Sequence, residues 1–141
     1  KKWHDDIMFK VKQTNKLVMP SGRTYKYLPE TNSMGNLKYP RTRILNYPVQ
    51  GLGADLMAIV RVSLYNKIVK LPGVKLINTV HDSIMLDYDP KVCYTNSIVE
   101  IVKECFHNVP DNFTKLFGKK FNLPMRVDIQ TGKSWGNLED L

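Results

Sequence analysis

The chain has 141 residues, of which 43% are hydrophobic, and this length and composition suit one domain with a buried core. Its 21 lysines and arginines outnumber 13 aspartates and glutamates, so the formal net charge is +8. Such a charge favours a polyanionic partner, although many proteins that bind no nucleic acid share it. No apolar stretch approaches the ~18 residues that span a bilayer, and no secretion signal follows the basic N-terminus.

The first half of the chain predicts short elements followed by one long helix. Residues 7–19 alternate loosely and indicate one or two strands or the end of a helix. The turn signal PSGR at residues 20–23 leads to a predicted strand over residues 24–28. Residues 29–40 are polar and contain Asn, Ser, Gly and Pro, so we expect a surface loop. Residues 41–69 form the longest predicted helix because apolar residues recur on one face at 3.6-residue spacing.

The second half predicts a hairpin, a helix and a closing strand. After LPG at residues 71–73 ends the long helix, an apolar hairpin is predicted over residues 75–88. A second helix is expected to start at residues 89–90, and a loop or irregular helix is expected over residues 108–122. A last strand is predicted near residues 125–129. Helices over a small antiparallel sheet make an α+β fold class.

Three positions in the predicted helices restrict their geometry. Pro48 should mark the first turn of the long helix or an irregularity, because an interior proline costs ~3 kcal/mol. Cys93 and Cys105 lie twelve residues apart on the second predicted helix, or about 18 Å at ~1.5 Å per residue. That distance is too long for a disulfide. We therefore expect two buried thiols in a reducing compartment.

The dipeptide His81-Asp82 interrupts the apolar run of the predicted hairpin. An acidic residue is almost never fully buried unless it is paired or binds a metal. Asp82 could lie in the hairpin turn, where aspartate is favoured. It could also present its carboxylate to a metal ion at the end of a rigid ribbon. The run by itself leaves both interpretations open.

Three segments in order resemble the motifs of family A DNA polymerases. NYPVQGLGADL at residues 46–56 is similar to the family's helix motif, N-x-P-x-Q-G-x-x-A-D followed by Ile or Leu. VHDS at residues 80–83 resembles the family's motif C, VHDE. PMRVDI at residues 124–129 and GKSW at residues 132–135 resemble its closing strand and G-x-x-W ending. The PSGR turn and the NYP sequence look closest to phage members of the family.

The resemblance implies that residues 1–141 form a single partial domain, the C-terminal part of a polymerase palm. Its small antiparallel sheet would contain the motif C hairpin, flanked by long helices. The family's motif A strand and its nucleotide-binding helix, R-x-x-x-K-x-x-x-F/Y-G, have no match in the sequence. A start at a residue other than Met also favours a fragment, a processed product or an excised segment.

The implied function is template-directed addition of deoxynucleotides to a primer 3′ end by two-metal phosphoryl transfer. Without motif A this activity is incomplete, so the chain alone is expected to be inactive. The implied partners are primer–template DNA and deoxynucleoside triphosphates, with Mg²⁺ as cofactor, no membrane, and a cytoplasmic location (host cytoplasm for a phage protein). The alternative is a non-catalytic basic DNA-binding domain with a polymerase-like fold.

The resemblance assigns the metal site to Asp82, as the motif C carboxylate of a site that holds two Mg²⁺ ions together with a motif A carboxylate. His81 would lie by the primer terminus and hydrogen-bond the primer backbone or a neighbouring side chain. The family usually has Glu where Ser83 stands, so the site would depend more heavily on Asp82. Asp87 lies about 16 Å away along an extended strand at ~3.3 Å per residue, too far to be the second ligand.

The other implied roles concern DNA. Gln50 and Asn46 match helix residues that contact the minor groove and backbone of the template–primer. The family's arginine before this motif falls between Arg41 and Arg43, so either could make its contact. Arg23 could reach a phosphate, or be a solvated turn residue.

Two further expectations concern contacts with protein. Asp55 is expected to have a capping or pairing role. A palm segment separated from its other strands leaves an unpaired sheet edge, so we also expect a partner carrying motif A and the nucleotide-binding helix, or self-association.

Overall fold

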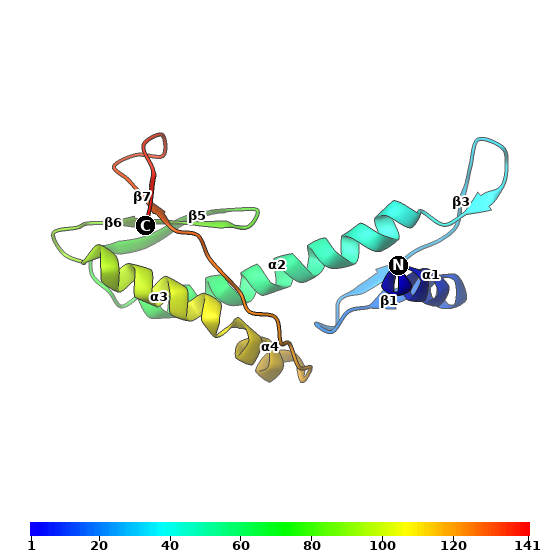
Figure 1. The fold of residues 1–141 in the computed structure, drawn as a ribbon, viewed down its shortest axis with the longest axis horizontal. Helices are drawn as coiled ribbons and strands as arrows, with labels where there is room; N and C mark the ends of the chain where they lie inside the picture. The colour runs from blue at the N-terminus through cyan, green and yellow to red at the C-terminus, as the bar shows by residue number, and fades with distance from the viewer. The chain divides into compact units, whose positions relative to one another are not determined.

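A computed structural model describes all residues, Lys1–Leu141 (Figure 1). They divide into two compact units, Lys1–Asp55 and Leu56–Leu141, and the long helix α2 (Arg41–Ile68) contributes to both. The chain contains four helices and four antiparallel two-stranded sheets. The α+β fold class is therefore confirmed, and the single partial palm domain stays a prediction.

The first unit begins with α1 (Lys2–Thr14), which packs against β1 (Lys16–Val18) (Figure 1). Asn15 ends the helix in a left-handed conformation with φ 54°, a common way for a helix to terminate. The loosely alternating region thus contains the end of a helix and one short strand. β1 pairs with β2 (Thr24–Lys26), so the strand expected after the PSGR turn is confirmed. The buried core of this unit consists of Met8, Val11, Leu17, Tyr27 and Ile44.

The polar region after β2 is exposed, as expected for a surface loop, and contains a minimal hairpin. β3 (Glu30–Thr31) pairs with β4 (Leu37–Lys38). The Asn32 carboxamide oxygen accepts hydrogen bonds from the backbone N–H groups of Met34 and Asn36, at 3.0 and 2.9 Å. This side-chain turn explains why so short a hairpin forms without a buried face.

Helix α2 confirms the long predicted helix, but Pro48 is its eighth residue and lies beyond the first turn. Of the two alternatives expected for Pro48, the first turn is excluded and a local irregularity of the helix remains. Proline has no N–H, so the Ile44 carbonyl lacks its usual helical donor four residues on. The Pro48 ring is fully buried, and apolar burial offsets part of the ~3 kcal/mol cost of an interior proline.

The second unit is built on the predicted hairpin. β5 (Val74–Val80) pairs with β6 (Ser83–Tyr88), with Val74 opposite Tyr88 and Val80 opposite Ser83 (Figure 1). The register shifts between Leu76 and Asn78, which places a bulge in β5. The ribbon and the C-terminal part of α2 share one core with α3. Its buried members are Leu64, Ile68, Val74, Ile98 and Cys105.

Helix α3 (Thr95–His107) starts later than predicted. Asp89 does not cap a helix: its carboxylate accepts a hydrogen bond from the Lys91 N–H at 2.9 Å. Its carbonyl accepts from the N–H groups of Val92 and Cys93. This turn uses the donors that a helix start would need, so Cys93 lies before α3 and the expectation of both cysteines on one helix is wrong. Both thiols are free.

The C-terminal region differs from the prediction in two places. α4 (Val109–Phe117) is a regular helix that buries Phe113 and ends at Gly118 in a left-handed conformation. The strand predicted near residues 125–129 is absent because no other segment pairs with it; the final pairing is β7 (Gln130–Thr131) with β8 (Glu139–Asp140). None of the four helices has the length and apolar character that a membrane crossing requires.

Candidate functional site

His81 and Asp82 form the two-residue turn between β5 and β6. His81 has φ 52°, and a positive φ at the first turn position matches the twist of a two-residue hairpin. Histidine enters this left-handed region more readily than β-branched residues do. The prediction that Asp82 lies in a hairpin turn is confirmed. This geometry equally presents the side chain at the end of a ribbon, so its metal role stays a prediction.

The Asp82 carboxylate is exposed and takes part in none of the chain's three ion pairs. Its oxygens also accept no hydrogen bond from any side chain or backbone donor. Mg²⁺ prefers oxygen ligands and keeps several waters, so a free carboxylate at a projecting tip fits as one ligand among several. The chain contains no group of three or more His, Cys, Asp or Glu side chains that could enclose a metal ion.

Asp87 lies towards the other end of the hairpin, where its partner in the register is Lys75. Four residues of β6 therefore separate it from Asp82. Asp87 is exposed like Asp82 and belongs to the same ribbon. It is thus a matched reference for the Asp82 carboxylate and does not contribute to the tip.

The other predicted residues lie in the first unit. Asn46 and Gln50 are exposed on α2, and a spacing of four residues places them on one helix face. Neither amide side chain forms a hydrogen bond within the chain. Because each amide has both a donor and an acceptor free, this face can bind polar groups of a ligand.

The arginines differ in how they are held. Arg41 is exposed and forms no ion pair, whereas Arg43 pairs with Glu30 at 2.8 Å. Both side chains of that pair are at least half exposed, so the pair contributes little and can open readily. Both arginines stay predicted DNA contacts, with Arg41 the freer of the two.

Arg23 belongs to a three-residue cluster that joins the PSGR turn to α2. Its guanidinium binds the Asp55 carboxylate through both Nη2 and Nε, the latter at 3.3 Å, and Ser21 Oγ donates to the same carboxylate at 2.6 Å. The hydrogen bond from Arg23 is the main cause that lowers the pKa of Asp55, against a smaller opposing effect of burial. The expected pairing role of Asp55 is confirmed. The sequence contains both partners but no signal that they meet.

Tyr25, on β2, is a second contact to α2 that the sequence did not indicate. Its hydroxyl donates a hydrogen bond to the Tyr47 carbonyl at 3.0 Å. The phenol passes directly over Gly51, where a Cβ atom would lie 1.7 Å from the Tyr25 hydroxyl oxygen. Glycine at this helix position is therefore explained by the close approach of Tyr25.

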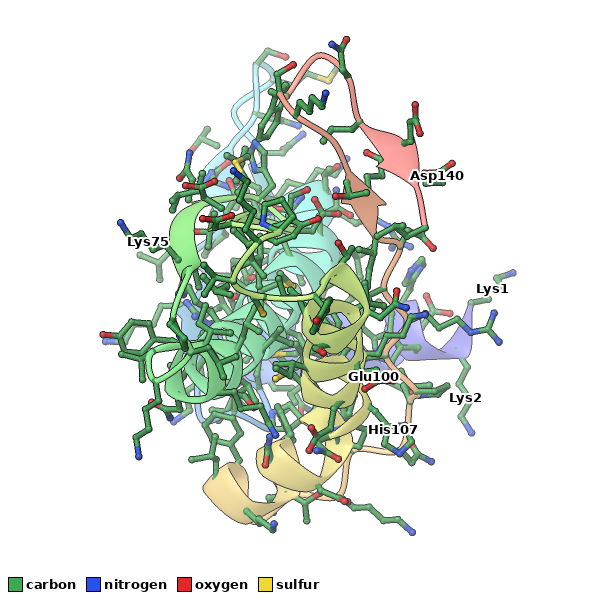
Figure 2. The ribbon with its side chains drawn as sticks, turned by 90° about the vertical axis from the view of Figure 1, so that its left-hand side faces the viewer. Lys1, Lys2, Lys75, Glu100, His107 and Asp140 are labelled. Atoms are coloured by element: carbon green, nitrogen blue, oxygen red, sulfur yellow. The ribbon has the colours of Figure 1, made fainter.

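The second unit also has an open groove of about 530 Å³ between α3 and the extended segment before β7. Figure 2 shows His107 on α3, next to this segment. The charged residues that line the groove are of both signs, and they are Lys103, Glu104, Arg126 and Asp128. No predicted site residue lies in the groove.

Comparison with known proteins defines the class of this chain. The sequence model of the protein family named DNA polymerase family A matches residues 1–137. The chain therefore belongs to this family. A DNA polymerase I of Borreliella burgdorferi is 29% identical over 116 residues, which are 80% of this chain and 12% of that protein. A DNA polymerase theta of Caenorhabditis elegans is 25% identical over 95 residues, 67% of this chain and 5% of that protein. The chain thus spans only a small part of these relatives.

Proposed function

We propose that this chain is the C-terminal palm part of a DNA polymerase, of a phage-like branch, that adds deoxynucleotides to a primer 3′ end. The observation that carries the proposal is the free Asp82 carboxylate at the tip of an antiparallel hairpin, in a chain of this family. Primer–template DNA and deoxynucleoside triphosphates are then its substrates, in the cytoplasm, or that of the host for a phage protein.

Asp82 is proposed to hold Mg²⁺ at the reacting phosphate. When bound, two Mg²⁺ ions activate the attacking primer oxygen and stabilise the charge that develops on the triphosphate. The carboxylate supplies oxygen ligands from a turn fixed by its flanking strand pair, Val80 and Ser83. His81, next to it, donates a hydrogen bond to the primer backbone. Ser83 brings no charge, so Asp82 is the sole acid of the turn.

Asn46 and Gln50 are proposed to contact the minor groove of the primer–template. Every correct base pair shows an acceptor at equivalent minor-groove positions, so an amide donor can test pair shape without reading sequence. The guanidinium groups of Arg41 and Arg43 bind the phosphate backbone, and such ionic contacts make the affinity for DNA fall as the salt concentration rises.

The proposed site is incomplete within these residues. The second metal-binding acid and the nucleotide-binding helix would come from another polymerase segment that carries motif A. Both outer edges of the β5–β6 ribbon are unpaired, so a strand of that segment, or of a second copy, could join it.

The decisive test is primer extension by the complete polymerase that carries this segment. We expect Asp82→Asn to abolish extension while binding of primer–template is largely kept, because the carboxylate acts on the metal ions and not on the duplex. Asp87→Asn, on the same ribbon, removes an equal charge and should extend normally. Equal extension by the Asp82 variant and wild type would overturn the assignment.

A second experiment uses the 141-residue chain with Mn²⁺ as a paramagnetic probe. We expect selective NMR line broadening at the residues of the β5–β6 turn and its loss in Asp82→Asn. The same chain should not extend a primer with Mg²⁺ and all four deoxynucleotides. Extension that disappears with Asp82→Ala would mean that a second metal carboxylate lies within the chain. Binding of DNA that needs neither Mg²⁺ nor Asp82, with no extension by the complete protein, would instead favour the non-catalytic DNA-binding domain.

A further inference from the structure

The inference concerns Asp55 and rests on the DNA-binding part of the proposed function. Asp55 is the last residue of the first unit, on the same helix as Asn46 and Gln50. Its side chain is 14% exposed, whereas that of its partner Arg23 is 46% exposed. The anchored member of the pair is therefore the acid, and the member that extends into solvent is the cation.

The geometry of the pair leaves part of the guanidinium free. Arg23 uses Nε and Nη2 on the two oxygens of Asp55, and Ser21 holds the carboxylate from another side. Nη1 donates no hydrogen bond within the chain. An arginine fixed by a two-point contact keeps its remaining donors in one direction, which reduces the entropy lost when it binds a further acceptor.

The arginine stem runs along the face of α2 that carries Gly51 and Asp55, which is turned by about 100–180° from Asn46 and Gln50 at 3.6 residues per turn. Arg23 Cδ lies 3.1 Å from the position of a Cβ atom at Gly51, the residue after Gln50. The head group then reaches Asp55, one helical turn further along. The hydrogen bond from Tyr25 to the Tyr47 carbonyl attaches β2, which directly follows Arg23, to α2 one helical turn before Gly51. The exposed cation is thus held at the helix turn that carries Asp55.

We propose that Asp55 is a positioning residue, which fixes Arg23 so that its free Nη1 group donates to a phosphate of the primer–template. Asp55 itself touches no DNA. A carboxylate near a DNA surface repels phosphate, so the arrangement is favourable only if the ordering of Arg23 outweighs that repulsion. The two effects of removing the Asp55 charge have opposite signs, which makes the proposal testable.

The test measures affinity of the 141-residue chain for a fluorescein-labelled primer–template, without Mg²⁺ or nucleotide, across a range of NaCl concentrations. We expect Asp55→Asn to weaken binding about fivefold, although it removes a negative charge. Asp6→Asn removes an equal charge from an exposed site on α1 and should bind as tightly as wild type or slightly tighter. Arg23→Ala should weaken binding about tenfold and reduce the salt slope by about one phosphate contact.

Two further variants separate positioning from a purely structural role. In the Arg23→Ala background, Asp55→Asn should cause no further loss, because the arginine that it orients is gone. Arg23→Lys keeps the charge but not the two-point fork, and should weaken binding about threefold while circular dichroism stays unchanged. If Asp55→Asn unfolds the chain, this lysine variant alone decides the question.

The proposal is overturned if folded Asp55→Asn binds as tightly as wild type or tighter, or if Arg23→Lys binds like wild type. It is also overturned if Arg23→Ala leaves the salt slope unchanged, since no phosphate contact is then lost. None of these measurements involves Asp82 or extension, so failure of the catalytic assignment is recognised separately.

Discussion

Gly51→Ala tests the close contact between β2 and α2. In an ordinary helix interior this change stabilises, because glycine is about 0.5–1 kcal/mol less favourable than alanine. Here the new methyl group would lie 1.7 Å from the hydroxyl oxygen of Tyr25 and 3.0 Å from its Cζ. The ring must therefore move.

The expected magnitude follows from what that movement breaks. Displacing the phenol loses its hydrogen bond to the Tyr47 carbonyl, worth about 0.5–1.5 kcal/mol. Arg23 Cδ, 3.1 Å from the new methyl group, must also shift, and such overpacking costs about 1–3 kcal/mol. After the helix preference of alanine is subtracted, we expect a net loss of about 1–3 kcal/mol in the free energy of unfolding.

The assay is urea unfolding followed by the fluorescence of Trp3, which lies in the first unit. All variants carry Trp135→Phe, so that the tryptophan of the second unit gives no signal. The matched background is Tyr25→Ala, which removes the obstructing ring. In that background only the flexible Arg23 stem still has to shift, so Gly51→Ala should be close to neutral and most of the loss seen beside Tyr25 should disappear.

The reasoning is refuted if Gly51→Ala stabilises the chain while Tyr25 is present. It is also refuted if the loss is the same with and without the ring, because the cost would then come from the backbone at Gly51. A reduced DNA affinity of the single variant would further link this contact to DNA binding.

Three other outcomes are expected. Phe113→Ala should lower the free energy of unfolding by about 3–5 kcal/mol in urea titrations, because the ring is 1% exposed, whereas Leu116→Ala on the exposed side should change it by less than about 0.5 kcal/mol. The pKa of Asp55 is lower in the folded state, so the stability that its carboxylate contributes is fully present above its ordinary pKa of 3.8. This stability is lost as pH falls through the lower, folded-state pKa. The difference in free energy of unfolding between wild type and Asp55→Asn, measured in urea titrations, should therefore be constant near neutral pH and shrink only in acid. Thermal unfolding should show His81→Val to be less stable than His81→Gly by about 1–2 kcal/mol, because His81 has a positive φ.

The sequence predicts best those elements whose signal is local. The hairpin and α2 are found because turn residues and apolar spacing lie within the segment itself. The extended segment at residues 125–129 alternates between half-buried and exposed side chains as a strand would. It is no strand because pairing needs a second segment, and the pattern of one segment contains no information about its partner.

The same distinction between local signals and contacts of distant segments applies to the candidate site. That Asp82 lies in a turn is a local property, and the sequence indicates it. The pairing of Arg23 with Asp55 joins residues 32 apart, and the passage of Tyr25 over Gly51 joins residues 26 apart. Each of these depends on how β2 meets α2, which no motif of either segment describes.

The β5–β6 ribbon has a consequence for hydrogen exchange. Each strand has one neighbour, and in an antiparallel pair alternate residues direct their N–H groups away from it. In the free chain about every second amide of the ribbon should therefore exchange rapidly with deuterium, between slowly exchanging neighbours. A strand that joined β5 would slow only the outward amides of β5, and one that joined β6 only those of β6. The exchange pattern of this hairpin would thus identify which edge another segment occupies.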